Sequence, residues 1–185
     1  MIEIRWHGRG GQGAVTSIEM LALAAIKEGK YAQGFPSFGP ERRGAPVAAF
    51  NRIDDKRIKV RSAIYDPDVV VVLDPSLVGL VNVLEGLKPD GILIVNTQKS
   101  PEEVGKELNF KGAVATVDAS KIAWQELGVP ITNTTMLGAL VKVVDLIKAK
   151  SLEAPLEERF GRLAPKNINA FKRAYKEVKI SKSAN

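Results

Sequence analysis

The chain has 185 residues and a mass of 20.0 kDa, which is the size of one domain and enough to bury a substantial core. Apolar residues make up 45% and charged residues 26%, so the composition excludes intrinsic disorder and a fibrous fold. With a formal net charge of +6, no cysteine and one histidine, the chain by itself excludes iron–sulfur clusters, cysteine-ligated zinc and a cysteine nucleophile.

The N-terminal part of the chain predicts a strand, a glycine-rich turn and a helix in that order. Residues 2–6 alternate between apolar and polar side chains, which is typical of a strand. The turn follows at once, and apolar residues then recur at helical spacing from Ala14 to Glu28, with Gly29 as a stop. The residues of the turn are Gly8, Arg9, Gly10, Gly11, Gln12 and Gly13.

A long loop and a hairpin are predicted next. Residues 34–46 hold three glycines and three prolines, which disfavour regular structure, and long loops within compact domains are often functional. Residues 47–53 and 57–61 then indicate two strands of an antiparallel hairpin, joined by a tight turn at residues 54–55. The loop also carries a run of charged residues, Glu41, Arg42 and Arg43.

The middle of the chain predicts buried parallel strands that alternate with helices. Three near-continuous apolar runs have the character of strands covered on both faces. They are residues 69–74, 92–96 and 113–118. A segment of helical character follows each run, at residues 75–85, 101–108 and 119–127. Asp74 and Asp118, at the ends of two of these strands, are interpreted as helix caps rather than metal ligands.

The C-terminal part of the chain predicts helices only. Asn133 and Thr134 are expected to cap a helix over residues 135–148, and residues 151–178 indicate two more helices. We therefore expect one α/β domain over residues 1–178, followed by a frayed tail at residues 179–185. Its fold class is a Rossmann-like, mainly parallel sheet flanked by helices, with an antiparallel hairpin and C-terminal helices.

The turn has the spacing of the dinucleotide-binding fingerprint, Gly8-x-Gly10-x-x-Gly13, between a strand and a helix. Glycine lets the backbone approach a pyrophosphate, and the amides at the start of the helix attract its charge. The acidic residue expected about 20 positions later is missing, which argues against NAD or FAD. The alternatives are a site for another phosphate group, or a tight turn that packs the helix against the strand.

Further candidate residues lie close to this turn or on the long loop. His7 precedes the turn, and we favour a hydrogen-bonding or phosphate-contact role, with a purely structural role as the alternative to it; no triad spacing supports catalysis. The arginine forks of Arg42 and Arg43 suit phosphate or carboxylate groups, so their loop is the best candidate for a contact surface. The simpler interpretation is a solvated cluster of charges.

Charge and hydropathy narrow the choice of partners and compartment. Basic residues concentrate in residues 30–61 and 150–185, but they are not interleaved with aromatic residues, so we expect no nucleic-acid partner. No secretion signal opens the chain and no apolar run approaches the roughly 20 residues that span a bilayer. We therefore expect a cytoplasmic protein without a membrane partner.

Three separated motifs resemble the gamma subunit of 2-oxoacid:ferredoxin oxidoreductases, most closely the pyruvate synthase type. They lie at residues 4–13, 38–46 and 133–139, and the likeness covers roughly residues 2–148. Many relatives read Tyr-Gly-x-Glu-x-Arg-Gly-Gly across the loop, whereas Phe38 and Ala45 stand at the first and last of those positions here. The loss of the phenol hydroxyl puts any role of that position in doubt, but not the resemblance.

The resemblance implies a place in a larger enzyme. Such a complex oxidatively decarboxylates a 2-oxo acid such as pyruvate, reduces ferredoxin and forms an acyl-CoA such as acetyl-CoA. It uses thiamine diphosphate, Mg²⁺, iron–sulfur clusters and coenzyme A. The gamma subunit packs against the catalytic subunits and is implicated in closing over coenzyme A, with alpha, beta and delta subunits as partners. The turn and the Glu41-Arg42-Arg43 loop would then contact coenzyme A, and the isolated chain would bind no cofactor and have no activity.

Two rival hypotheses remain at this point. The first is a small stand-alone nucleotide-binding oxidoreductase, which would bind NAD, NADP or a flavin tightly. The second is a basic RNA- or DNA-binding module, whose affinity for nucleic acid would depend strongly on salt. A gamma subunit would instead co-purify with its partner subunits.

Overall fold

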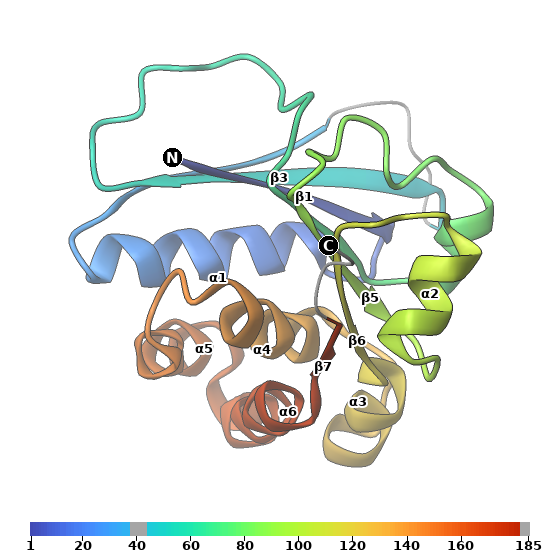
Figure 1. Cartoon of the computed structure of the whole chain (residues 1–185). Coiled ribbons are helices and arrows are strands. Elements are labelled where there is room, and N and C mark those ends of the chain that lie inside the picture. Colours follow the sequence, from blue (N-terminus) through green and yellow to red (C-terminus); the bar gives the residue numbers. More distant parts are fainter. Residues whose placement is uncertain (38–43, 182–185) are drawn as a thin grey trace.

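The computed structural model describes residues 1–37 and 44–181 and shows one sheet flanked by helices (Figure 1). Within these residues the sheet has seven strands in the order β2-β3-β1-β4-β5-β6-β7. Strands β1, β4, β5 and β6 are parallel, whereas β3 runs antiparallel to both of its neighbours and β7 antiparallel to β6. The strands are β1 (Ile2–Arg9), β2 (Tyr31–Pro36), β3 (Pro46–Asp54), β4 (Val69–Val72), β5 (Ile92–Asn96), β6 (Ala113–Val117) and β7 (Lys179–Ile180).

The helices divide unequally between the two faces of the sheet. On one face α1 and α4 pack on the strands, with α5 and α6 outside them, and a large core fills the space between. On the other face a smaller core forms over β4, β5 and β6, with α2 beside it. The helices are α1 (Ala14–Lys27), α2 (Pro101–Glu107), α3 (Ala119–Leu127), α4 (Asn133–Val144), α5 (Glu153–Phe160) and α6 (Ala164–Glu177).

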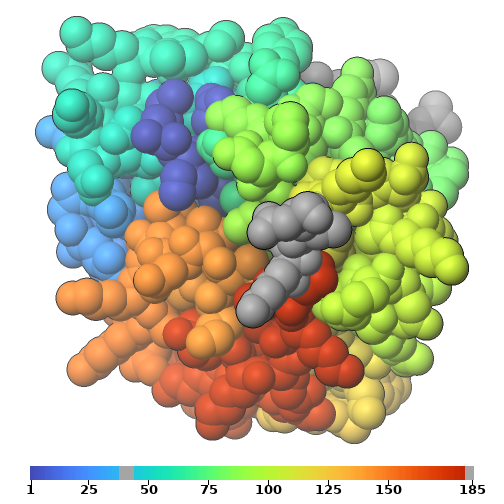
Figure 2. All heavy atoms as spheres, viewed as in Figure 1, coloured from blue at the N-terminus to red at the C-terminus, as the bar shows by residue number. Residues whose placement is uncertain are grey.

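Short 3₁₀ turns link several elements: η1 (Pro75–Gly79), η2 (Ala149–Leu152) and η3 (Gly161–Leu163). In the space-filling view the C-terminal helices form one side of the molecule, in orange and red, and the segment that follows β3 forms the opposite side, in cyan (Figure 2). No helix in residues 1–37 and 44–181 is both long enough and apolar enough to cross a membrane.

The expected mixed α/β fold is confirmed, as are the glycine turn between β1 and α1 and the three buried parallel strands. The predicted hairpin is wrong in its second strand, because residues 57–61 belong to no strand. β3 already has β1 on one side and β2 on the other, so neither of its edges is free for residues 57–61. β2 was not expected, since Gly34 and Pro36 disfavour a strand, but an edge strand tolerates both.

Three further expectations need correction. The helix predicted at residues 75–85 is only η1, because the carbonyls of Val83 and Glu85 accept from Arg5 Nη2 instead of continuing a helix. α4 starts at Asn133, with Thr132 as its cap residue. The frayed tail is wrong for residues 179–181, since β7 pairs with β6 and the Ser181 amide donates to the Val114 carbonyl; residues 182–185 lie outside the described residues.

Candidate functional site

The candidate site lies at the carboxyl ends of β1 and β4, where the direction of chain progress across the sheet reverses. From β1 the chain continues through α1 to β2 and β3 on one side, and from β4 it continues to β5 on the other. Open α/β sheets bind their ligands at such a switch point. The glycine turn follows β1 at this place, and Asp74 follows β4.

Asp74 is the centre of a hydrogen-bond network at the switch point. Its Oδ2 accepts from Arg9 Nε at 3.0 Å and from Gln12 Nε2 at 2.7 Å. Its Oδ1 accepts from the amide and the hydroxyl of Ser76, at 2.9 and 2.6 Å. Burial raises the pKa of Asp74, but the hydrogen bonds from Ser76 and Gln12 and the charge of Arg9 outweigh it, so the pKa lies below its ordinary value.

The same network ties the glycine turn to the end of the long loop. Arg9 Nη1 donates to the carbonyl of Gly44 at 3.0 Å, and Arg9 Nη2 donates to Ser76 Oγ at 2.8 Å. Backbone bonds reinforce the contact, because the Gly10 amide donates to the Ala45 carbonyl and the Gly44 amide to the Gly10 carbonyl. Two of the three motifs found in the sequence are therefore physically joined. The loop residues Glu41, Arg42 and Arg43 lie outside the described residues.

The turn itself needs glycine at two positions. Gly11 and Gly13 have φ angles of 94° and 86°, a left-handed conformation that favours glycine. A Cβ on Gly13 would also lie 2.6 Å from Nδ2 of Asn133, at the start of α4. The side chain of Gln12 closes the turn, since its Oε1 accepts from the Arg9 amide at 2.8 Å. The glycines thus allow a close approach of α1 and α4.

The third motif, at residues 133–139, meets the glycine turn through this approach. Ser17 Oγ on α1 donates to the carbonyl of Asn133, and Thr134 Oγ1 on α4 donates to Asn167 Oδ1 on α6. Asn133 and Thr134 are nearly fully buried. The sequence-based reasoning identified Asp74 as a cap, which its bond to the Ser76 amide confirms, but it missed the contacts of Asp74 to Arg9 and Gln12.

His7 lies outside this network and acts as an acceptor. Arg5 Nε donates to His7 Nε2 at 3.0 Å. Burial, with the nearby charge of Arg5, lowers the pKa of His7 to about 4. The imidazole is therefore neutral near pH 7, and this nitrogen already has a donor. Its observed partner is a group of the protein itself, as the purely structural alternative describes.

The arrangement limits what the switch point can bind. Arg9 and Gln12 already donate to Asp74, so a carboxylate of the chain itself takes up the side-chain donors of the turn. No group of three or more metal-ligating side chains comes together within the described ranges 1–37 and 44–181. The turn therefore fixes the backbone at Gly44 and Ala45 more than it offers free donors to a ligand.

Comparison with known proteins identifies the family of the chain. The family model of pyruvate ferredoxin/flavodoxin oxidoreductase matches residues 3–177. The chain is 57% identical over 182 residues to the pyruvate/ketoisovalerate oxidoreductases common subunit gamma of Thermococcus kodakarensis, which covers 97% of this chain and 98% of the relative.

Solved structures show the same fold. The crystal structure of the pyruvate oxidoreductase subunit PorC from Thermotoga maritima aligns with a TM-score of 0.88 and 46% identity, over 98% of both chains. The 2-oxoglutarate:ferredoxin oxidoreductase from Magnetococcus marinus, solved with 2-oxoglutarate, coenzyme A and succinyl-CoA, aligns with a TM-score of 0.76 and 21% identity. That match covers 95% of this chain and 30% of the longer one, and it supports the fold alone.

Proposed function

The chain belongs to the pyruvate ferredoxin/flavodoxin oxidoreductase family as a gamma subunit, and from that premise we propose how it serves the complex. The complex oxidatively decarboxylates pyruvate to acetyl-CoA and reduces ferredoxin. In it, this chain holds the catalytic subunits, and its loop that carries Glu41, Arg42 and Arg43 helps to close the site over coenzyme A. Arg42 and Arg43 would contact the phosphate groups, because arginine forks match phosphate oxygens, and Glu41, which is an acceptor, would contact a donor group of the same ligand.

The observation that carries this proposal is the anchor beneath the loop. The segment leaves the sheet at Ser37, whose amide donates to the Ala48 carbonyl, and returns at Gly44, which Arg9 and Gly10 hold. Both ends of the segment are thus fixed to the sheet at a switch point. The backbone of Gly8, Gly10, Gly11 and Gly13 lies at the base of this loop, with Arg9 and Gln12 engaged in the anchor.

The cofactors of the complex belong to other chains in this proposal. Thiamine diphosphate, Mg²⁺ and iron–sulfur clusters supply the decarboxylation and electron-transfer chemistry when bound. Clusters require thiolates, and this chain has no cysteine, so its residues do not fit them. We assign those groups to alpha, beta and delta subunits, and ferredoxin meets the complex through them. The chain purified alone is expected to show no turnover and no visible absorption.

The test uses the reconstituted complex with Arg42→Ala and Arg43→Ala in this chain. Loss of charged hydrogen bonds to phosphate is expected to raise KM for coenzyme A by about tenfold, while KM for pyruvate stays the same. Lys166→Ala on the exposed side of α6 is the matched control and changes neither constant. An unchanged KM for coenzyme A in the arginine variants contradicts the proposed contact.

A further inference from the structure

Strand β2 is an open edge of the sheet. Among the described residues it pairs with β3 alone, and it stands at the end of the strand order. Native proteins guard such edges with charges, bulges or short strands. The opposite edge follows this rule, because β7 has two residues. β2 has six residues and no charged side chain, and only Pro36 at its end limits pairing.

The register shows which backbone groups of β2 face outward. The Ser37 amide donates to the Ala48 carbonyl, so residue 37 directs its backbone groups toward β3. In an antiparallel pair this direction alternates from residue to residue. Ala32 and Gly34 therefore direct their amides and carbonyls away from β3, to the open edge. These groups are available to a further strand.

A hollow lies beside this edge on the α1 face. It has a volume of about 520 Å³, and Gly34 of β2 forms part of its wall. Its lining combines apolar side chains, Met20 and Leu23 of α1 and Pro155 of α5, with the charged side chains of Glu19, Glu158 and Arg159. Leu23 is 43% exposed, and Ile26 one turn further along α1 is 53% exposed. A strand added to β2 would bury this surface.

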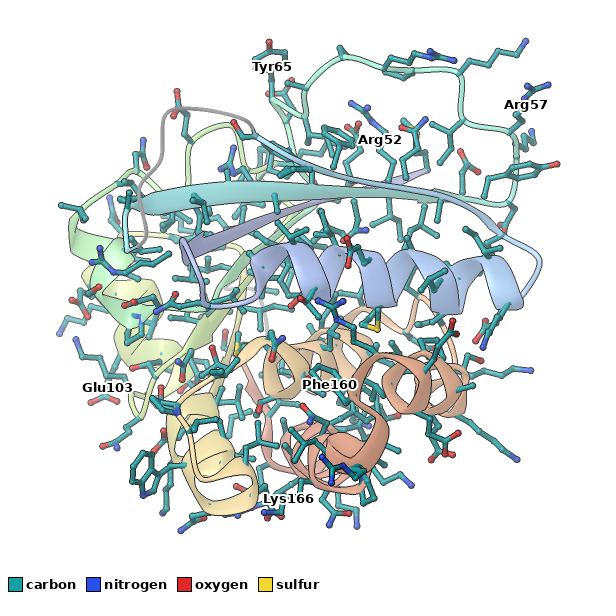
Figure 3. All side chains as sticks on the ribbon, turned by 180° about the vertical axis from the view of Figure 1, so that it is seen from behind. Arg52, Arg57, Tyr65, Glu103, Phe160 and Lys166 are labelled. Atoms are coloured by element: carbon teal, nitrogen blue, oxygen red, sulfur yellow. The ribbon has the colours of Figure 1, made fainter. Side chains whose placement is uncertain are left out.

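A second hollow lies beside β2 on the opposite face, beneath the segment that follows β3. It has a volume of about 650 Å³, and its lining includes Phe35, Phe50 and Tyr65. Figure 3 shows this segment, which carries Arg57 and Tyr65, on one side of the sheet, and α1 on the other. β2 thus has a hollow on each face. When a strand is added to a sheet edge, pockets of this kind receive the alternate side chains of the added strand.

Within the segment above the second hollow, residues 56–61 carry four basic side chains and no acidic one. All four cations are exposed, and none of them takes part in an ion pair within the part of the chain that the structure describes. They are Lys56, Arg57, Lys59 and Arg61. Arg61 also lines the hollow itself. A second copy of this chain would bring the same cations to the edge and be repelled, whereas an acidic segment would be attracted.

We propose that β2 accepts a strand from a partner subunit of the oxidoreductase complex, and that this strand alternates apolar and acidic side chains. Its backbone pairs with Ala32 and Gly34. Its apolar side chains enter the hollow beside α1, and its carboxylates face the four cations of residues 56–61. This inference rests on the proposed function, because it requires assembly with other subunits, and it assigns the surface through which the chain assembles.

Hydrogen exchange in the isolated chain and in the reconstituted complex tests the inference. In the complex the amides of Ala32 and Gly34 are expected to become protected, and zero-length crosslinking is expected to join Lys56 or Lys59 to an acidic strand of another subunit. Failure of the chain to enter the complex would overturn the proposed function. Entry into the complex with both amides exchanging as in the free chain would overturn only the strand addition.

Two variants complete the test. Ala32→Pro removes an outward amide without touching a β3 bond, so urea unfolding should change little while the affinity for the other subunits falls about tenfold. Arg57→Glu with Lys59→Glu should weaken assembly similarly, whereas the matched control, Lys106→Glu with Lys111→Glu near the opposite edge, should not. Equal affinities for all variants, or protection of β2 by self-association of the isolated chain, would overturn the inference.

Discussion

Arg9 Nε lies 3.0 Å from Asp74 Oδ2, and this ion pair joins the carboxyl ends of β1 and β4 across 65 positions of sequence. The same guanidinium holds Gly44, where the chain returns from the long loop. The pair therefore helps to fix the position of Gly44, which is distant in sequence from both of its residues. Its removal should affect the stability of the fold and the position of Gly44 together.

Asp74→Ala is expected to lower the free energy of unfolding by about 2 kcal/mol, because Arg9 and Gln12 lose their acceptor and η1 loses its cap. Asp118→Ala is the matched control, since Asp118 also caps a helix by accepting from a backbone amide, that of Lys121. It should cost about 1 kcal/mol. Urea unfolding measures both values, and equal losses would show that the contacts to Arg9 and Gln12 contribute nothing.

His7 should remain neutral well below its ordinary pKa of 6.5, since burial and Arg5 lower the pKa to about 4. It is the one histidine of the chain, so NMR gives a single imidazole signal, which should not titrate between pH 8 and pH 5. The unfolded chain takes up this proton near pH 6.5 and the folded chain does not. Stability should therefore fall as the pH drops from 6.5 to 4, by up to about 3 kcal/mol.

The variant His7→Gln provides the control for that pH dependence. Glutamine offers an oxygen acceptor to Arg5 but has no proton to gain in this range. The slope of stability between pH 6.5 and 4 should be flatter in the variant than in the unchanged chain. A histidine signal that shifts with a midpoint near 6.5 would contradict the assigned burial.

Gly138→Ala should destabilise the fold by about 3 kcal/mol, because α4 and α6 approach too closely to admit a side chain there. A Cβ at this position would lie 2.2 Å from the carbonyl oxygen of Phe171. Gly105→Ala in α2 is the control, since its nearest neighbour would be 3.4 Å away. That change should stabilise the helix by about 0.5 kcal/mol. Thermal or urea unfolding of the two variants measures the contrast.

Glu3→Gln should cost about 3 kcal/mol, because it leaves the guanidinium of Arg52 buried without its counter-charge. Arg52 is 1% exposed, and its Nε donates to Glu3 Oε1 at 2.7 Å. Its Nη2 donates to the Ala63 carbonyl at 3.2 Å, but this neutral acceptor supplies no counter-charge, and Nη1 is buried without a partner among the described residues. The exposed pair Lys99–Glu107 is the control, and Glu107→Gln should change stability by less than about 0.5 kcal/mol.

Sequence patterns predicted the parts of the fold that depend on neighbours along the chain. The apolar runs that became β4, β5 and β6 and the periodicity of α1 identified those elements correctly, because a strand or helix buries a face that recurs at a fixed period. The run of glycines at residues 8–13 likewise predicted a turn, and Gly11 and Gly13 have the positive φ angles that favour glycine. The family resemblance came from three motifs that the fold brings together.

The tertiary structure determined which strands pair and which side chains from distant parts of the sequence are in contact. Local pattern assigned β3 a partner at residues 57–61, whereas the sheet gives it β1 and β2, because strand pairing depends on which edges remain free after the core has formed. The tertiary structure also determined that Asp74 accepts hydrogen bonds from Arg9 and Gln12 as well as from the Ser76 amide of its own turn. The sequence alone determined the absence of thiolates, and with it the kinds of metal centre this chain cannot hold. Contacts between residues far apart in sequence leave no local pattern, so the anchor of the loop and the open edge of β2 became visible only in the folded chain.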